Sequence, residues 1–406
     1  MKRTDLLPVF LGTDLNCYNC ARAFHEAYGV KSHAFGRYGI GSTMYSKIVS
    51  YSVVENLDDP TVAVKTLLDY AAMHPGKKKI LMGCTDDYVN LIMSHREELS
   101  SEYVMPYPDF ALAQKITLKS NFYELCEKEG IAYPKTVIVT KDEPSLPLLP
   151  FPFPVIVKPA SSAAYWKHPF DGMQKVYVAE TEEEAKKIIG EIYQSGYEEK
   201  IVVQDMIPGT DSNMFVLTAY CGQDGKVKNM CLGHVLLEEH TPKGRGNHAA
   251  IVTENNEALY RQFQSFLEGM HYTGFANFDI KFDPRDSSFR AFEINTRQGR
   301  SNYYVTSSGQ NIAKIVVEDL IDGLKKTGTE YGTNEFFWRY IPDSVIRKYV
   351  PETMKNKAFA LKKAGKSASL FYRPDLCLNP RRLIYTLVHE YRHVKKFDQY
   401  LGKQAK

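Results

Sequence analysis

The sequence predicts an α/β protein with a parallel sheet near the N-terminus and an antiparallel sheet in its second half. Buried-strand patterns alternate with helical patterns over residues 1 to about 110, which is typical of a parallel sheet covered by helices. A proline-dense stretch, DEPSLPLLPFPFPV, cannot be helical and marks a domain boundary. Four segments of alternating apolar residues follow after Gln204, which indicates an antiparallel sheet.

The N-terminal elements begin with LPVFLGTD, which reads as a buried strand. CYNCARAFHEAYG continues with apolar residues at helical spacing and ends at Gly29, a C-cap glycine. KKKILMGCTDDYVNLIMSHREELS is a second strand-turn-helix unit. Because ligands bind at the C-terminal ends of parallel strands, we expect Asp14, Asn16, Thr85 and Asp86 at this edge. They are either substrate contacts or turn and helix-cap residues.

The later elements divide the chain further. QKITLKSNFYELCEKEGIAYPKT predicts one helix closed by Gly130, and PVIVKPA, TEEEAKKIIGEIYQSG and KIVVQDMIPG predict a strand, a helix and a strand. The antiparallel strands are NMFVLTAYC, NMCLGHVLLEE, GFANFDIKFD and SFRAFEINTR, with the helix NEALYRQFQSFLEGMHY among them. We predict five segments: an α/β substrate domain at 1–112, a connecting helix and linker at 113–151, a small lid at 152–203, an antiparallel-sheet domain at 204–326, and a basic, Tyr-rich extension at 327–406.

The composition is that of an ordinary globular protein, with 44% hydrophobic and 24% charged residues. The net charge is only +3, from 51 Lys and Arg against 48 Asp and Glu, so no overall field favours nucleic acid or a membrane. Seven cysteines without framework spacing indicate reduced thiols. The first apolar run is too short for a signal peptide, and no run reaches the roughly 20 residues that span a bilayer. We expect a cytoplasmic protein with no nucleic-acid partner and no membrane insertion.

Two strands carry the residues that predict chemistry. NFDIKFD contains Asp279, and AFEIN contains Glu293 and Asn295. Because alternate residues of a strand share a face, Glu293 and Asn295 project together, and a hairpin through PRDS brings Asp279 to that face. Two carboxylates and an amide without nearby Cys or His suit Mg²⁺, which normally serves nucleotide phosphates. The alternative is a solvated strand end.

Other segments are consistent with a bound nucleotide. Lys158, in the apolar strand VIVKPA, can meet phosphates as a point charge, and DGMQKV closes a loop that can cover them. QDMIPGTD offers a linker whose backbone pairs with an adenine edge and whose Asp211 accepts from ribose hydroxyls. Lys281 shares a face with Asp279, where it contacts phosphate or pairs with Asp283. The order of these segments along the chain predicts a nucleotide site.

In this order of motifs the chain resembles the ATP-grasp superfamily of carboxylate–amine ligases, from about Leu7 to Gly323. EINTR is similar to a motif of biotin carboxylases, and GMQKV resembles the lid loop of D-alanyl-D-alanine ligases. The family has a glycine-rich lid, whereas this chain has ASSAAYWKHPFDGM in its place. The resemblance implies an ATP-grasp fold, two Mg²⁺ ions on Asp279, Glu293 and Asn295, and ATP contacts at ten positions: Lys115, Lys158, Ser161, Ser162, Lys175, Gln204, Asp205, Ile207, Asp211 and Lys281.

A closer resemblance is to the D-aspartate ligases of bacterial wall synthesis. It lies in LGTDLNCYNCARAFHEAYGVKS, in AFGRYGIGSTMYSKIV and in the C-terminal extension, stretches that related ligases of unknown substrate share. It implies that the β-carboxylate of D-aspartate is joined to the lysine ε-amine of a peptidoglycan precursor. It also implies a homodimer, since many relatives are dimers.

The arginines after the second strand then have a function. A carboxylate is a poor electrophile until its oxygen becomes part of a phosphate leaving group, so positioning and charge neutralisation dominate. We expect Arg297 and Arg300 to hold the acyl phosphate and the oxyanion formed when the amine attacks. HTPKGRGNH adds candidates for binding the acidic substrate or the γ-phosphate, with a solvent-exposed turn as the alternative: Lys243, Arg245 and His248.

Two motifs compete with this interpretation. HEYRH, His389 to His393, fits the zinc-peptidase pattern with Glu390 as base, but catalytic zinc needs a third protein ligand and only Asp398 follows. A solvated helix face with basic partners is favoured. CYNC resembles a dithiol redox site, and buried small residues are favoured instead. The alternative functions are another ATP-grasp amino-acid or dipeptide ligase, and a non-catalytic ATP-binding regulatory protein.

Overall fold

The computed structural model describes residues 2–241, 244–324 and 326–402, without the side chains of 162 and 163. Its contacts group the chain into two compact units. Unit 1 comprises Met1–Phe110, Asp211–Phe278 and Asn295–Lys406, and unit 2 comprises Ala111–Thr210 and Asp279–Ile294. The α/β class with one parallel and further antiparallel sheets is confirmed.

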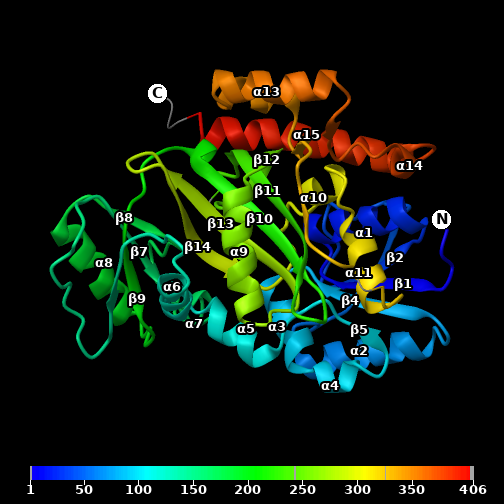
Figure 1. Cartoon of the computed structure of the whole chain (residues 1–406), viewed down its shortest axis with the longest axis horizontal. Helices are drawn as coiled ribbons and strands as arrows, with labels where there is room; N and C mark the ends of the chain where they lie inside the picture. Colours follow the sequence, from blue (N-terminus) through cyan, green and yellow to red (C-terminus); the bar gives the residue numbers. More distant parts are fainter. Residues whose placement is uncertain (1, 242–243, 325, 403–406) are drawn as a thin grey trace. The chain divides into compact units, whose positions relative to one another are not determined.

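Unit 1 begins with a five-stranded parallel sheet in the order β3-β2-β1-β4-β5 (Figure 1). Helix α1 follows β1 as predicted: Asp14 caps its first turn by accepting from the Cys17 backbone N–H, and Gly29 ends it with a φ of +67°. Asp59 and Thr85 cap α2 and α3 in the same way. The elements are β1 Leu6–Leu11, α1 Leu15–Tyr28, β2 Ser32–Gly36, β3 Val49–Val53, α2 Pro60–Ala72, β4 Lys78–Gly83, α3 Asp86–Ser94, α4 Arg96–Leu99 and β5 Tyr103–Val104.

The second sheet has the strand order β14-β13-β10-β11-β12-β16-β17, with β15 beside β11. Pairs β10–β11, β11–β12 and β12–β16 are antiparallel, as the alternating apolar pattern predicts. The contacts assign the first half of β13 to unit 1 and its second half, with most of β14, to unit 2. The strands are β10 Met214–Cys221, β11 Val227–Glu238, β12 His248–Glu254, β13 Gly274–Asp283, β14 Ser288–Asn295, β15 Glu330–Tyr331, β16 Phe337–Arg339 and β17 Ser367–Ala368.

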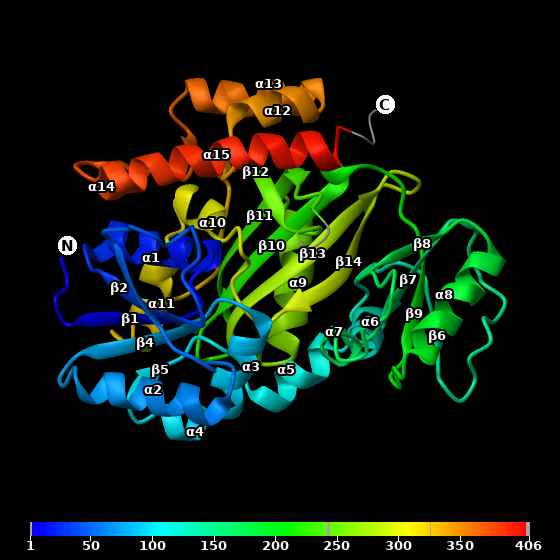
Figure 2. The same ribbon diagram turned by 180° about the vertical axis from the view of Figure 1, so that it is seen from behind.

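Helices of the C-terminal segment complete unit 1. The long helix α15 runs beside α13, and α14 lies at its N-terminal end (Figure 2). None of the described helices is both long and apolar enough to cross a bilayer. The helices after β12 are α9 Glu257–Gly269, α10 Tyr303–Ser307, α11 Ile312–Leu320, α12 Asp343–Tyr349, α13 Glu352–Lys363, α14 Arg373–Leu376 and α15 Pro380–Tyr400.

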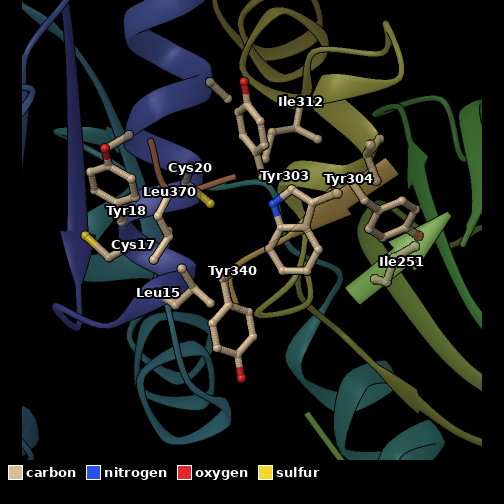
Figure 3. Close-up of a cluster of buried hydrophobic side chains, with 14 of the residues drawn as sticks. Leu15, Cys17, Tyr18, Cys20, Ile251, Tyr303, Tyr304, Ile312, Tyr340 and Leu370 are labelled. Carbon is tan, nitrogen blue, oxygen red and sulfur yellow. The ribbon is translucent and has the colours of Figure 1, made fainter. Parts of the chain in front are cut away.

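One hydrophobic core joins these parts of unit 1 (Figure 3). Tyr18 and Cys20 of α1 lie in it with Tyr304 of α10, and Tyr340 and Leu370 enter it from the C-terminal segment. The C-terminal extension is therefore packed into the same core as the N-terminal domain. Cys17 and Cys20 are completely buried, and burial raises the pKa of Cys20 well above its usual value, so CYNC is a packing element.

Unit 2 is a four-stranded antiparallel sheet in the order β6-β9-β7-β8, with its own apolar core. Helix α8 packs on β7 and β8. The predicted lid strands and helix are present, and β6 adds a strand from the segment that we assigned to a linker. The elements are α5 Phe110–Thr117, α6 Lys119–Lys128, β6 Thr136–Val139, β7 Val155–Pro159, α7 Ser162–Tyr165, β8 Tyr177–Ala179, α8 Glu182–Gln194 and β9 Ile201–Asp205.

The prediction of one helix up to Gly130 is wrong in one respect. The segment forms two helices, α5 and α6, because Leu118 takes an extended conformation with φ −71° and ψ 118°. Leu118 therefore breaks the helix. Apolar periodicity does not reveal it, since both helices keep apolar residues on one side.

Candidate active site

Glu293 is the centre of a cationic cluster in unit 2. Its carboxylate lies 3.2 Å from the Lys119 ammonium, which α6 presents. The Lys119 charge holds the pKa of Glu293 at about 2, with further lowering by Lys175 and Lys158, although burial opposes this. Glu293 is therefore an ionised carboxylate faced by three lysines.

Lys158 is the buried member of this cluster. It lies on β7 with 8% exposure, and its ammonium lies 5.7 Å from the centre of the Phe292 ring. Burial lowers the pKa of Lys158 to about 7, Lys119 lowers it further, and Glu293 opposes them. A buried ammonium that shares one carboxylate is able to bind a further anion, and the phosphate contact of Lys158 stays a prediction.

The predicted lid loop contributes one exposed cation. Lys175 precedes β8 and is near enough to act on the charges of Lys158 and Glu293. The Ser161 hydroxyl accepts from the Ala164 backbone N–H and so caps α7. The side chain of Ser162 lies outside the described residues. Lys115 is exposed on α5, whereas Lys119, four residues later, makes the contact with Glu293.

The three predicted magnesium ligands lie along a hairpin of β13 and β14. The Asn295 amide nitrogen lies 3.5 Å from the Asn277 carbonyl, so the strands are adjacent there. Asp279 and Glu293 each lie two residues from this point toward the hairpin turn, and alternate strand residues share a face. Two carboxylates and an amide fit a hard cation such as Mg²⁺. The described residues contain no group of three or more His, Cys, Asp or Glu that could hold a metal.

The predicted adenine linker is held by side-chain contacts. The buried Gln204 donates to the Thr136 hydroxyl at 2.7 Å, and Asp205 forms an ion pair with Arg285 at 2.6 Å. Lys281 donates to the carbonyl of Ile207 at 2.8 Å. The Asp283 carboxylate instead pairs with Arg285 and Arg290, so the alternative that Lys281 pairs with Asp283 is not supported.

The two predicted catalytic arginines lie in unit 1, each beside a carboxylate. Arg297 donates to both carboxylate oxygens of Asp86, at 2.6 and 3.0 Å. Arg300 lies 3.5 Å from Glu239 and 5.5 Å from the centre of the Tyr340 ring. The Asn19 side chain also donates to the Arg300 carbonyl at 2.9 Å, which fixes the backbone of this segment.

Glu239 connects Arg300 to the C-terminal segment. Its carboxylate is buried, accepts from the Tyr340 hydroxyl, and lies 3.8 Å from Nε2 of His393. Burial raises the pKa of Glu239, but His393, Arg300 and Tyr340 together lower it to about 2. Glu239 is thus an ionised carboxylate held by three donors, one of which is Arg300.

The HEYRH histidines belong to this network. The expectation of a solvated helix face is wrong for His393, which is 4% exposed and whose Nδ1 lies 2.9 Å from the His389 carbonyl. Burial lowers the pKa of His389 to about 3, with a further contribution from His393. The two rings lie 4.2 Å apart between centres, but Glu239, the carboxylate 3.8 Å from His393, is engaged by Arg300 and Tyr340. Through Glu239, the HEYRH segment helps to hold Arg300, and this arrangement does not favour a zinc site.

Asp14 and Asn16, predicted at the substrate edge, differ in their surroundings. Burial raises the pKa of Asp14, and Arg300 and Arg297 oppose this, so the three charges lie within electrostatic range. Asn16 is completely buried: its amide nitrogen donates to the Cys84 and Gln298 carbonyls, and its oxygen accepts from Asn302. The prediction that Asn16 contacts substrate is corrected, because its hydrogen-bonding groups hold the 298–302 segment on α1.

The segment HTPKGRGNH is only in part as predicted. His248 begins β12, is 7% exposed and lies 3.5 Å from Glu238. Burial lowers the pKa of His248 to about 4, so it is neutral at neutral pH and is not the expected cation. Arg245 is exposed, and Lys243 lies outside the described residues. Asp211, the predicted ribose acceptor, accepts from His240 at 2.7 Å and from the Glu238 backbone N–H at 2.9 Å.

Two groups of residues escaped the sequence-based prediction. Lys119 is one of several helical lysines, and Glu239 and Tyr340 are a strand-end acid and a core aromatic, so their residue types carry no signal. The only sequence signal for Lys119 is its position in a helix, four residues after the predicted Lys115. Two shallow pockets, one of about 370 Å³ lined by Cys126, Tyr133 and Arg290 among others, include none of the candidate residues.

Solved structures share the fold at low sequence identity. The biotin carboxylase domain of 2-oxoglutarate carboxylase from Hydrogenobacter thermophilus has a TM-score of 0.60 at 12% identity, covering 81% of this chain and 73% of that one. N5-carboxyaminoimidazole synthetase from Staphylococcus aureus has a TM-score of 0.58 at 12% identity, covering 90% of this chain and 86% of that one. L-amino acid ligase from Bacillus licheniformis has a TM-score of 0.52 at 15% identity, covering 78% of this chain and 71% of that one. These likenesses confirm the predicted ATP-grasp fold.

Sequence comparison gives a more specific result. No protein-family model matches the chain. A D-aspartate ligase of Enterococcus faecium (strain Aus0004) is 39% identical over an alignment of 416 positions, which covers 98% of this chain and 98% of that protein. Identity at this level over nearly the whole length of both chains confirms the resemblance, and the chain belongs to the D-aspartate ligase family of ATP-dependent carboxylate–amine ligases.

Proposed function

We propose that the protein activates the β-carboxylate of D-aspartate as an acyl phosphate and joins it to the ε-amine of a lysine in a peptidoglycan precursor. The observation that carries this proposal is the charge arrangement in unit 1. Two guanidiniums, Arg297 and Arg300, act on the charge of one buried carboxylate, Asp14, and each is also held by a second carboxylate, Asp86 or Glu239. The two carboxylates of aspartate would share these guanidiniums with Asp86 and Glu239, and the ammonium of aspartate would face Asp14. The D-aspartate ligase of Enterococcus faecium supplies the substrate hypothesis.

Unit 2 supplies the nucleotide end of the proposed reaction. Lys158, Lys119 and Lys175 all act on the Glu293 carboxylate, and even with Asp279 of the same hairpin counted, three cations face two carboxylates. A polyphosphate is the anion that best neutralises such a cluster. We assign Lys119 to the phosphate contacts in addition to Lys158 and Lys175. The remaining predicted ATP contacts stay predictions: Lys115, Gln204, Asp205, Ile207, Asp211 and Lys281.

The proposed metal is Mg²⁺, held by Asp279, Glu293 and Asn295. When bound, Mg²⁺ neutralises phosphate charge and lowers the barrier to phosphoryl transfer. The donor set fits a hard cation, and Glu293 is ionised at neutral pH. Lys119, whose ammonium lies 3.2 Å from the Glu293 carboxylate, would stand beside a metal held there and could donate to the same phosphate oxygens.

The reaction then has two steps. In the first, a carboxylate oxygen of the amino acid attacks the γ-phosphorus, the bond to the bridging oxygen breaks, and ADP leaves. In the second, the neutral amine attacks the acyl carbon, a C–N bond forms, the C–O bond to phosphate breaks, and the amine proton leaves with the phosphate. Arg297 and Arg300 donate to the oxygens that become negative. Asp14 accepts from the ammonium of the amino acid.

The experiment measures phosphate release and hydroxamate formation with ATP, Mg²⁺ and hydroxylamine in place of the amine. D-aspartate should give hydroxamate, whereas D-asparagine should not, because its β-carboxyl group is blocked. D-isoasparagine, which keeps the β-carboxylate, should retain part of the activity. Nucleotide binding without turnover for every amino acid would instead support the regulatory alternative.

The acceptor is tested in a second assay. A peptide with a free lysine side chain should replace hydroxylamine, and the same peptide acetylated on the ε-nitrogen should not. The cytoplasm is the proposed compartment, since six of the seven free cysteines are buried thiols. The predicted homodimer is tested by sedimentation velocity.

A further inference from the structure

Helix α15 presents an exposed apolar face. Leu383, Ile384, Leu387, Val388 and Tyr391 are each between 39% and 62% exposed. Their spacing of one, three or four residues places them on one side of the helix. The opposite side carries His393 and Phe397, which are buried in unit 1. Soluble proteins rarely leave so large an apolar stripe without a partner.

Neighbouring segments add further exposed apolar residues. Leu378, just before α15, is 92% exposed, and Phe371 is 38% exposed. The loop with exposed Tyr38, Ile40 and Tyr45 is fixed to the helix. Asn379 donates to the Tyr45 carbonyl at 2.7 Å, and the rings of Tyr45 and Tyr385 lie 5.9 Å apart. The apolar stripe and this loop therefore form one surface of unit 1.

Arg382 explains why the loop stays on the helix. Its guanidinium donates to the carbonyls of Gly41, Ser42 and Met44 at 2.7 to 3.2 Å, and it pairs with the buried Asp375 at 3.1 Å. Since a guanidinium with several backbone acceptors is rigidly held, the exposed tyrosines of the loop keep their place beside α15.

The border of the apolar surface is basic. Arg381, Arg392, Lys395 and Lys396 are exposed on α15, and the Lys395 ammonium lies 4.7 Å from the centre of the Tyr391 ring. The acids on the helix do not neutralise them, because Asp398 pairs with Lys348 at 2.7 Å and Glu390 is half-buried. The whole chain carries only +3, so this is a local concentration of positive charge.

The charge decides which partner fits. A second copy on a two-fold axis would bring the same patch against itself and place arginines and lysines of one helix beside those of the other. An anionic lipid surface complements the basic border and accepts Leu, Ile, Val and Tyr side chains below its headgroups. Tyrosines are enriched at that depth of a bilayer.

We propose that the exposed face of α15, with the 38–45 loop attached to it, docks the protein onto an anionic membrane surface. The helix lies in the headgroup plane and does not cross the bilayer. The inference is independent of the proposed ligase reaction, and vesicle binding is measured without ATP or amino acid.

The test is cosedimentation of the full-length protein with vesicles of phosphatidylcholine alone or mixed with phosphatidylglycerol. We expect binding to the mixed vesicles, weakened by salt, and at least tenfold weaker binding to phosphatidylcholine. Each basic residue near an anionic surface contributes roughly fivefold. The variant Ile384→Gln/Leu387→Gln/Tyr391→Gln should lose at least tenfold in binding, and Lys395→Gln/Lys396→Gln at least fivefold.

The matched control is Leu148→Gln, since Leu148 is 98% exposed and lies in unit 2. It should bind vesicles like the unchanged protein. Thermal unfolding of each variant shows that folding is retained, as expected for substitutions of exposed residues. Equal binding to both vesicle types, no binding to either, or dissociation of a wild-type dimer by the apolar variant would each overturn the proposal.

Discussion

Both units place cations beside carboxylates, but in different proportions. In unit 2, three lysines, Lys119, Lys158 and Lys175, share the Glu293 carboxylate, and Asp279 is the only other carboxylate of the candidate site. In unit 1, each arginine has a carboxylate of its own: Asp86 for Arg297 and Glu239 for Arg300. An excess of positive charge predisposes a site to bind an anion, whereas a paired cation is held in position by its neighbour.

The residue types agree with this difference. Lysine is a compact, flexible point charge that adapts to phosphates, and its pKa responds to burial. Arginine stays charged and donates in a fixed plane, which suits the orientation of an acyl phosphate. We therefore expect the lysines to control nucleotide affinity and the arginines to control turnover. The predictions below test this contrast.

Replacing the buried lysine should have the largest effect. Lys158→Met removes the ammonium that lacks a carboxylate of its own, so kcat/KM for ATP should fall by at least about a hundredfold. ATP affinity, measured by calorimetry, should fall with it. Lys141→Met is the matched control, because Lys141 forms an exposed pair with Glu198 in the same unit. Retention of ATP affinity by Lys158→Met would contradict the phosphate role.

The same variant makes a prediction for stability. The pKa of Lys158 is about 7 in the folded protein and 10.5 ordinarily, so the unfolded chain binds more protons between these values. The contribution of Lys158 to the free energy of unfolding of the wild-type protein therefore rises as the pH increases from about 7 to 10.5. Lys158→Met should stabilise the nucleotide-free protein at pH 7 by on the order of 4 kcal/mol, because each pKa unit corresponds to about 1.4 kcal/mol. Thermal unfolding should show this gain shrinking toward pH 10.5, and a destabilised variant would contradict it.

Loss of an arginine should act on turnover. Arg300→Ala and Arg297→Ala should each lower kcat by about a hundredfold, because an oxyanion donor is lost, with ATP affinity changed by less than about threefold. Hydroxamate assays and calorimetry separate the two effects. Arg261→Ala, in an exposed ion pair with Glu257 in the same unit, should change neither. If ATP affinity fell as far as kcat, the contrast between lysines and arginines would be lost.

The carboxylate that holds Arg300 should have a smaller effect. Glu239→Gln keeps the size of the side chain but removes its charge, so Arg300 is held less firmly and kcat should fall by about tenfold. Glu239→Asp keeps the negative charge and should therefore retain part of the kcat that Glu239→Gln loses. Glu254→Gln is the matched control, since Glu254 is also held by a histidine and a lysine, His234 and Lys357. A change confined to unfolding temperature would indicate a structural role only.

The smallest effect concerns pH. Because the pKa of Lys158 is about 7, raising the pH from 7 to 8 lowers its protonated fraction by roughly fivefold, and ATP affinity should fall by a similar factor. Calorimetry in buffers of different ionisation enthalpy should show proton uptake on ATP binding at pH 8. Constant affinity across this range, or proton release, would show that Lys158 does not bind phosphate as an ammonium.

Local patterns were sufficient to select part of this candidate site. Strand alternation placed Glu293 and Asn295 on one face, and a lysine inside an apolar strand identified Lys158. The same reasoning failed for Asn16, whose amide is completely buried, and for His248, which is neutral. A polar residue at a strand end looks the same in sequence whether it contacts a ligand or holds a neighbouring segment.

The amino-acid order alone determined the α/β class, the two sheets and the strands that carry Asp279, Glu293 and Lys158, because periodicity and turn residues act over a few neighbouring positions. Only the tertiary structure decided that Lys119 contacts Glu293, and that Glu239, Tyr340 and His393 meet at Arg300. These residues come from elements far apart in the chain, and packing of a shared core brings them together. Their contacts depend on distance in space, which local patterns do not encode.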